Sequence, residues 1–444
     1  MKKIVFLFAS LVILVSCDPK IDEYKATPGS ADFSKFIVVG HSLAAGYSNG
    51  ALYKSGQEVS VPNLVAEQML SVGGTPLIQP MVTSEYGVLP GKRKLGYTTS
   101  CNGITSLGVV PDVGDLEPLG PIGYAVTNLA VPGMKSFHAF VPHYGDFSAL
   151  PYANPYYCRF ATNPANAVVD EIVPLNGSFF MLWLGDNDVL SYALAGGEAD
   201  SITPLPLFQQ AMGGLVQTLT ANGAKGVVST VTDVTSSPFF TTIPYNGLVL
   251  DTAQAAQVNY AMQLFGLAPI LNYTYKPGPN PFLITDPTSP HPYFKVRLMQ
   301  PGEMVLLTVP QDSLKCGGWG IISPWALQPA PIPDQFILTT EEIAEIQTAV
   351  LGYNEAINGL ANQFGLAVCD MNENLKNMTT GIVWDGVKLN TKFITGGTFS
   401  TDGIHLTPRG NAVAANFFID AINAKYGSTL PHVNVTAYPG LIFP

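Results

Sequence analysis

The segment FIVVGHSLAAG, residues 36–46, decides the fold because it joins a short apolar run to a glycine-bounded turn. Residues 36–39 predict a strand that is buried on both faces, and Gly40 ends it. Ser42 then lies where the strand turns into a helix. Such a turn exposes a serine hydroxyl at the carboxyl end of the strand, close to a helix N-terminus. A nucleophile needs that position, although a serine that only caps a helix would occupy it too.

Further apolar runs and helical patterns alternate along the chain. The runs predict strands at 124–131, 178–184, 225–231 and 366–369, and the patterns between them predict helices at 61–70, 206–221, 252–265, 340–364 and 408–426. Thr340 is the expected N-cap of the fourth helix; Thr407, Pro408 and Gly427 mark the start and the end of the last one. This alternation predicts a three-layer α/β/α sandwich with a parallel central sheet.

Two long stretches without a clear pattern, at about 71–123 and 266–335, interrupt this framework. Loops of that length are uncommon in a compact domain unless they have a function. We therefore expect two insertions that shape a site, within a single domain that spans residues 31–444.

The composition excludes several classes of protein. With 47% hydrophobic and 12% charged residues, the chain can bury enough apolar surface to offset its conformational entropy, so it is not a disordered chain. Its net charge of −11 argues against binding to nucleic acid.

The N-terminus predicts export. A basic start is followed by an apolar run at 4–15, which is too short to span a bilayer but fits a signal peptide. The run ends in Leu-Val-Ser-Cys17, which resembles the lipobox of bacterial lipoproteins; an ordinary signal peptide with an incidental cysteine is the alternative. We expect a signal peptide at 1–16, a tether at 17–30, and a body that is held at a bacterial membrane only through a lipid on Cys17.

Export permits disulfides among the remaining cysteines. Cys101 and Cys158 lie in loop-like stretches and are the expected pair, whereas Cys369 lies in an apolar run and is expected to be a buried thiol. No cysteine or histidine spacing suggests a zinc site, so no metal is expected.

A histidine and an aspartate stand close together near the C-terminus. Asp402 and His405 are three residues apart, just before the helix that Thr407 caps. One turn can point both side chains the same way. The carboxylate can then hold the proton of one imidazole nitrogen and leave the other nitrogen basic toward a serine.

Two glycine-containing turns follow other predicted strands. Gly133 ends the segment 128–133 and could offer a backbone N–H, and Asn187 in the segment 185–188 could offer a side-chain amide. Because ligands bind at the carboxyl edge of open α/β sheets, these groups are expected near Ser42.

Taken together in chain order, the blocks Gly40-His-Ser42-Leu, 128–133, 185–188 and Asp402-Gly-Ile-His405 resemble those of the GDSL/SGNH hydrolase family of serine esterases. The resemblance implies a flavodoxin-like strand order, with Ser42 as nucleophile, His405 as general base and Asp402 as its orienting group. It further implies an oxyanion hole made by the N–H groups of Ser42 and Gly133 and the side chain of Asn187. No cofactor is implied.

One residue departs from the family pattern: His41 stands where the family usually has an aspartate. It is either a group that supports the site or a neutral turn residue. The stretch around it also approaches the Gly-x-Ser-x-Gly elbow of α/β-hydrolases, but that elbow follows several strands, and its Asp and His lie apart in sequence. Too few residues separate Cys17 from Ser42 for those strands.

The expected function is hydrolysis of carboxylic esters, with either acylated glycans or lipid esters as substrates. Aromatic residues in the stretch 137–160 are candidates for the mouth of the site, or are buried beneath the loop. The alternative is a surface lipoprotein that binds glycans and has lost turnover. Such an esterase is expected to lose activity below about pH 6.5, where a free imidazole becomes protonated.

Overall fold

The computed structural model describes residues 25–322 and 328–444. Its centre is a parallel sheet of four strands in the order β1 (Phe36–Gly40), β4 (Phe179–Trp183), β5 (Lys225–Ser229) and β13 (Ala367–Cys369). All five residues of β1 and of β4 are buried, as their apolar sequences predicted. The chain is therefore a mixed α/β protein with an all-parallel central sheet, and the α/β class is confirmed.

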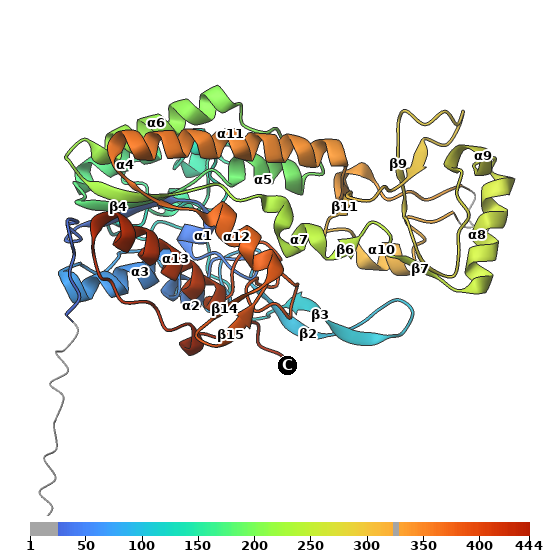
Figure 1. Ribbon diagram of the computed structural model, residues 1–444, viewed down its shortest axis with the longest axis horizontal. Coiled ribbons are helices and arrows are strands. Elements are labelled where there is room, and N and C mark those ends of the chain that lie inside the picture. The colour runs from blue at the N-terminus through green and yellow to red at the C-terminus, as the bar shows by residue number, and fades with distance from the viewer. Residues whose placement is uncertain (1–24, 323–327) are drawn as a thin grey trace, which may run out of the picture.

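Helices cover both faces of this sheet, because alternate side chains of each strand point to opposite sides. One face packs against α4 (Val168–Leu175), α5 (Asn187–Leu194), α6 (Leu205–Thr220) and α11 (Thr340–Phe364). The other face packs against α1 (Ser42–Ala45), α3 (Val61–Met69), α12 (Met371–Thr380) and α13 (Pro408–Tyr426). Figure 1 shows α6 and α11 above the sheet and α3 and α13 below it. The short helix α2 (Lys54–Glu58) lies beside α3.

The helices predicted on the sheet formed within a residue or two of their expected ends. The N-cap of α11 is Thr339 and not Thr340, because the Thr339 hydroxyl accepts the N–H of Glu342 and the Glu342 carboxylate accepts the N–H of Thr339. The limits of α13 are as predicted: Thr407 caps it and Gly427 ends it in the left-handed conformation.

The strand predicted at 124–131 is wrong. Only Asn128 forms a bridge with Val38 of β1, although the N–H groups of Leu129 and Val131 still bond to carbonyls of β1. The N–H groups of Thr127 and Asn128 instead bond to the carbonyl of Ile78, so a loop rather than another strand lies along this edge.

Residues 243–322 and 328–338 form a lobe to one side of the sheet (Figure 1). Its elements are β6 (Ile243–Pro244), β7 (Leu248–Leu250), α8 (Thr252–Leu264), α9 (Ala268–Leu271), β8 (Gly278–Asn280), β9 (Leu283–Thr285), β10 (Val296–Leu298), β11 (Met304–Val305), α10 (Gln311–Lys315) and β12 (Ile337–Leu338). The helix predicted at 252–265 is α8, but it packs within an apolar cluster of the lobe and not on the sheet. Helix α7 (Pro238–Thr241) leads from β5 into the lobe.

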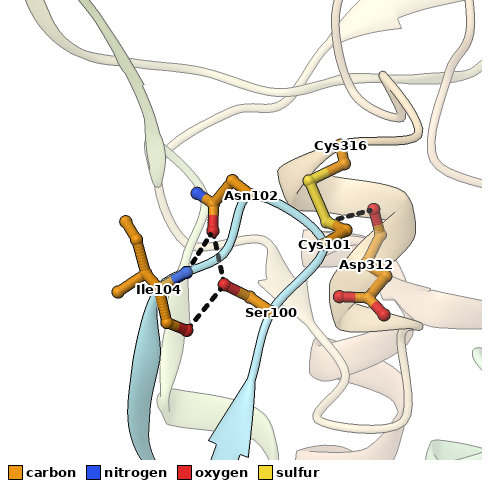
Figure 2. Close-up of a disulfide and its surroundings, with 6 residues drawn as sticks. All are labelled: Ser100, Cys101, Asn102, Ile104, Asp312 and Cys316. Atoms are coloured by element: carbon orange, nitrogen blue, oxygen red, sulfur yellow. Dashed lines mark hydrogen bonds between the residues drawn. A yellow bond between two sulfur atoms is a disulfide. The ribbon is translucent and has the colours of Figure 1, made fainter.

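A hairpin of β2 (Arg93–Thr99) and β3 (Thr105–Pro111) occupies part of the stretch that lacked a pattern. Its turn carries Cys101, which is bonded to Cys316 after α10 (Figure 2). The predicted pairing of Cys101 with Cys158 is therefore wrong. Cys158 is a buried free thiol, whereas the hairpin turn is exposed and reaches the lobe. Cys369 is a buried free thiol, as expected.

A second hairpin, β14 (Ile382–Trp384) with β15 (Val387–Leu389), precedes the C-terminal turn that leads into α13. The predicted signal peptide at 1–16, Cys17 and the first part of the tether lie outside the described residues. Within the described residues, no helix has both the length and the apolar character needed to cross a bilayer.

Candidate active site

Ser42 is the first residue of α1, and one residue, His41, separates it from the end of β1. The turn is tight because Gly40 lies against the neighbouring strand: a Cβ there would come within 2.8 Å of the carbonyl oxygen of Trp183. His41 is the N-cap, and its Nδ1 accepts the N–H of Leu43. This geometry holds the Ser42 side chain at the carboxyl end of the strand, as the sequence predicted.

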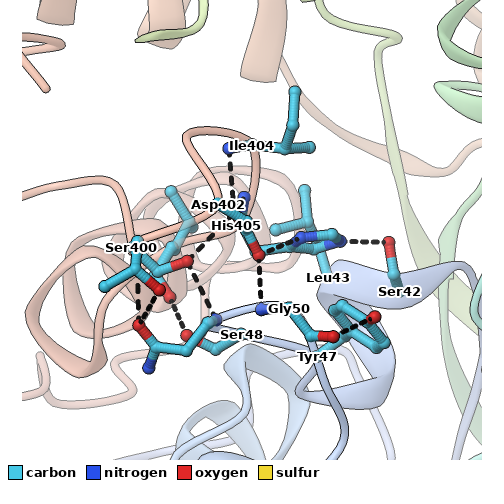
Figure 3. A network of polar contacts seen from close by, with 12 residues as sticks. Ser42, Leu43, Tyr47, Ser48, Gly50, Ser400, Asp402, Ile404 and His405 are labelled. Atoms are coloured by element: carbon cyan, nitrogen blue, oxygen red, sulfur yellow. Dashed lines mark hydrogen bonds and ion pairs between the residues drawn. The ribbon is translucent and has the colours of Figure 1, made fainter. Parts of the chain in front are cut away.

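The Ser42 hydroxyl meets His405, which is 363 residues away in the chain (Figure 3). The distance from His405 Nε2 to Ser42 Oγ is 2.8 Å, and the distance from His405 Nδ1 to Asp402 Oδ2 is 2.9 Å. Because an ionised carboxylate only accepts hydrogen bonds, Nδ1 carries the imidazole proton. Nε2 then accepts the hydrogen of the serine hydroxyl. The three predicted residues form one continuous hydrogen-bonded chain.

The Asp402 carboxylate is held by hydrogen bonds to both oxygens. Oδ1 accepts the backbone N–H groups of Ile404 and His405 and the hydroxyl of Ser400, and Oδ2 accepts the N–H of Gly50. Burial would raise the pKa of Asp402, but the neighbouring His405 and these hydrogen bonds outweigh it and hold the pKa well below its usual range. The carboxylate is therefore ionised and fixed in orientation beside the imidazole.

The turn at 400–406 is joined to the segment that follows α1. The Ser48 hydroxyl donates to the carbonyl of Leu406, and the N–H of Asn49 donates to the hydroxyl of Ser400. Figure 3 shows Ser48 and Ser400 on the side of Asp402 away from Ser42. They tie the two ends of the chain together at the site, so the distance from Ser42 to His405 depends on a rigid support.

Tyr47 packs on the imidazole of His405. The two ring centroids are 4.6 Å apart, and the Tyr47 hydroxyl donates to the carbonyl of Gly50. The aromatic ring limits rotation of the imidazole. The sequence reasoning missed Tyr47, which has no motif of its own.

Asn187 lies in the same cavity as Ser42 and His405. It is the first residue of α5, and its Nδ2 donates one hydrogen bond of 3.1 Å to the carbonyl of Met134. An amide has two such hydrogens, so one remains for a ligand. Within the described residues, the N–H of Ser42 has no acceptor either.

Gly133 lies next to Met134 and has a φ of +79°, which a residue with a side chain would adopt only with strain. Its N–H has no acceptor within the described residues, but Gly133 is not among the residues that line the cavity. The structure thus brings three of the five predicted site residues, Ser42, Asn187 and His405, to one cavity. Asp402 does not line the cavity but is bonded to the imidazole of His405.

His41, next to Ser42 in the chain, forms a second buried pair. Its Nε2 lies 2.7 Å from Asp186 Oδ2, and Asp186 Oδ1 accepts the N–H and the hydroxyl of Thr232. Burial would raise the pKa of Asp186, but the pairing with His41 and the bonds from Thr232 hold the pKa below its ordinary value. His41 is therefore a bonded part of the site and not a free turn residue.

A cavity of about 680 Å³, counting its open mouth, begins at the Ser42 hydroxyl. Helix α12 supplies Met371, Leu375 and Met378 to its wall. These residues follow an i, i+4, i+7 pattern that sequence reasoning missed, because no helix was predicted there. The aromatic residues of 137–160 are not among its lining residues: Tyr157 is fully buried, whereas Tyr152 is 90% exposed.

No group of three or more potential metal-ligating side chains occurs among the described residues. Comparisons with protein-family models, with curated proteins and with solved structures gave no match. The function therefore has to be argued from the chemistry of this site.

Proposed function

We propose that this protein is a serine esterase of the GDSL/SGNH type, with Ser42 as nucleophile, His405 as general base and Asp402 as its orienting group. The proposal depends mainly on one observation, the chain of hydrogen bonds from Ser42 through His405 to Asp402. Helices on both faces of a parallel sheet, with the site at its carboxyl edge, support the finer assignment of a three-layer sandwich with family-like topology and two insertions.

In the proposed reaction, Ser42 Oγ attacks the ester carbonyl carbon while its proton passes to His405 Nε2. The Asn187 amide and the N–H groups of Ser42 and Gly133 would receive the developing oxyanion, and each such donor is typically worth about 3 kcal/mol in the transition state. The intermediate then expels the alcohol, which takes the proton from His405. Water repeats the sequence on the acyl-enzyme and releases the acid.

A labelling experiment tests this proposal. The purified protein is treated with a fluorophosphonate probe and digested, and the labelled peptide is mapped by mass spectrometry. We expect the label on Ser42, hydrolysis of a short p-nitrophenyl ester, and loss of both in Ser42→Ala. Ser237→Ala, which changes another serine that lines the cavity, is the matched control and should keep the label. A protein that binds glycans but takes no label would instead be the non-catalytic lipoprotein.

We also propose that the chain is exported and attached to a bacterial membrane through a lipid on Cys17. The disulfide between Cys101 and Cys316 supports export, because such bonds persist in oxidising compartments. Incorporation of labelled fatty acid into the wild type but not into Cys17→Ser tests the anchor. We also expect the Cys17→Ser variant, which takes up no labelled fatty acid, to be released from the membrane fraction.

A further inference from the structure

We infer that the cavity beside Ser42 binds the acyl part of the substrate, and that this part is an unbranched apolar chain of medium length. The inference rests on the esterase function proposed above and decides between its two substrate classes. It favours esters of fatty acids over acetylated glycans.

The wall of the cavity is largely apolar. Helix α12 contributes Met371, Leu375 and Met378, and the strand and turn residues around them add Trp183 and Phe399. Methionine side chains adapt to a flexible chain, since they have several rotatable bonds and a polarisable sulfur. Removing both this wall and an acyl chain from water stabilises the complex without the need for directional contacts.

Most polar side chains in the wall are already bonded within the protein, and the free hydrogen of the Asn187 amide is the proposed oxyanion donor. His41 and Thr232 bond to Asp186, and His405 bonds to Ser42. Among the lining residues, Ser237 Oγ and Trp183 Nε1 are buried polar atoms with no partner in the described part of the chain. Two such atoms are too few for a sugar ring, whose hydroxyls would each need a partner on burial.

The order of the reaction steps assigns the cavity to the acyl group rather than the alcohol. The alcohol has to leave, and water has to reach Ser42, while the acyl group is still attached to Oγ. A partly enclosed cavity therefore suits the group that stays through both steps. The alcohol part would lie toward the solvent, where a large group can be accommodated.

The size of the wall sets an approximate chain length. Seven residues separate Met371 from Met378, so their stretch of α12 covers about 10 Å along the helix axis, which matches an acyl chain of about eight carbons.

The test measures kcat/KM for p-nitrophenyl acetate, butyrate, octanoate and palmitate, with the wild type and two α12 variants. We expect octanoate to be preferred over acetate by at least about tenfold. Leu375→Trp should lower the ratio of the octanoate rate to the acetate rate by about tenfold or more, because the indole fills the cavity beyond the reacting carbon. Asn377→Trp, on the exposed side of the same helix, is the matched control and should change neither rate.

If the protein hydrolyses the acetate ester through Ser42 but does not prefer octanoate, the inference about the acyl chain is overturned. The esterase function stays intact in that case. Absence of hydrolysis of all four esters would remove the esterase function itself. If Leu375→Trp loses the acetate rate too, Met378→Ala takes its place. That variant should move the preferred chain length upward, and an unchanged preference would overturn the inference.

Discussion

Two histidine–aspartate pairs flank Ser42, and they differ in what the imidazole does with its second nitrogen. His405 uses Nδ1 for Asp402 and turns Nε2 to the Ser42 hydroxyl. His41 uses Nε2 for Asp186 and Nδ1 for the N–H of Leu43, so both of its nitrogens bond to the protein. The side chains of the first pair are 13% and 17% exposed, and those of the second pair are 2% and 7% exposed.

The contrast shows that residue types alone do not define a role in catalysis. An imidazole can move a proton only if one nitrogen is basic and faces the reacting group. His405 meets this requirement. His41 instead joins the turn after β1 to the turn after β4, which carries Asn187. We therefore expect His41 and Asp186 to fix the distance between Ser42 and Asn187, the proposed nucleophile and oxyanion donor.

The largest expected effect comes from removing the imidazole that faces Ser42. His405→Ala should lower kcat for p-nitrophenyl octanoate by about 10³- to 10⁶-fold, since groups that act as a unit lose nearly all activity together. His432→Ala, which removes an exposed histidine paired with Asp420, is the control and should be neutral. A loss of less than tenfold in His405→Ala would mean that the base lies elsewhere.

A smaller but still large effect is expected when the orienting carboxylate is neutralised. Asp402→Asn should lower kcat by about 10³- to 10⁴-fold, because an amide no longer holds the imidazole proton on Nδ1. The loss should appear in kcat more than in KM, which steady-state kinetics measure. Full activity in this variant would show that Asp402 only stabilises the turn at 400–406.

Exchanging the members of each pair separates the two roles. His41→Asp places two buried carboxylates face to face and should lower kcat/KM by about 10- to 100-fold through displacement of the Ser42 turn. Adding Asp186→His restores a donor and an acceptor and should recover most of that activity.

The same exchange in the other pair should recover nothing. The double variant Asp402→His with His405→Asp has no imidazole nitrogen at the Ser42 hydroxyl, so its rate should stay at the level of His405→Ala. Suppose instead that the double variant His41→Asp with Asp186→His folds, as judged by circular dichroism, and yet recovers no activity. That result would argue against a purely positioning role for His41.

The smallest expected effect is on stability in acid. Asp402 and Asp186 both have a pKa below the ordinary value in the folded state. Their contribution to stability is therefore complete above about pH 4, the unfolded value, and is lost as the pH falls toward the folded one. The melting temperature should fall as the pH drops below about 4, and it should fall less steeply in Asp186→Asn and Asp402→Asn.

The strands of the sheet could be predicted from sequence because each is a short apolar run with a turn at its end. Helix α13 was equally clear, since Thr407 and Gly427 mark its limits in the sequence itself. The prediction of a strand at 124–131 failed because the apolar run there resembles a strand. The partners of its N–H groups depend instead on the loop at Ile78. Helix α12 was missed although its apolar spacing is regular.

By itself, the sequence determined the α/β class, the turn that presents Ser42, and the short spacing from Asp402 to His405. These features are local, and periodicity or turn chemistry specifies them over a few residues. Only the tertiary structure decided that Cys101 pairs with Cys316, that His41 meets Asp186, and that α12 forms the wall of the cavity. Such contacts join distant segments, and a buried polar group or thiol pairs with whatever the packing of the chain brings within reach.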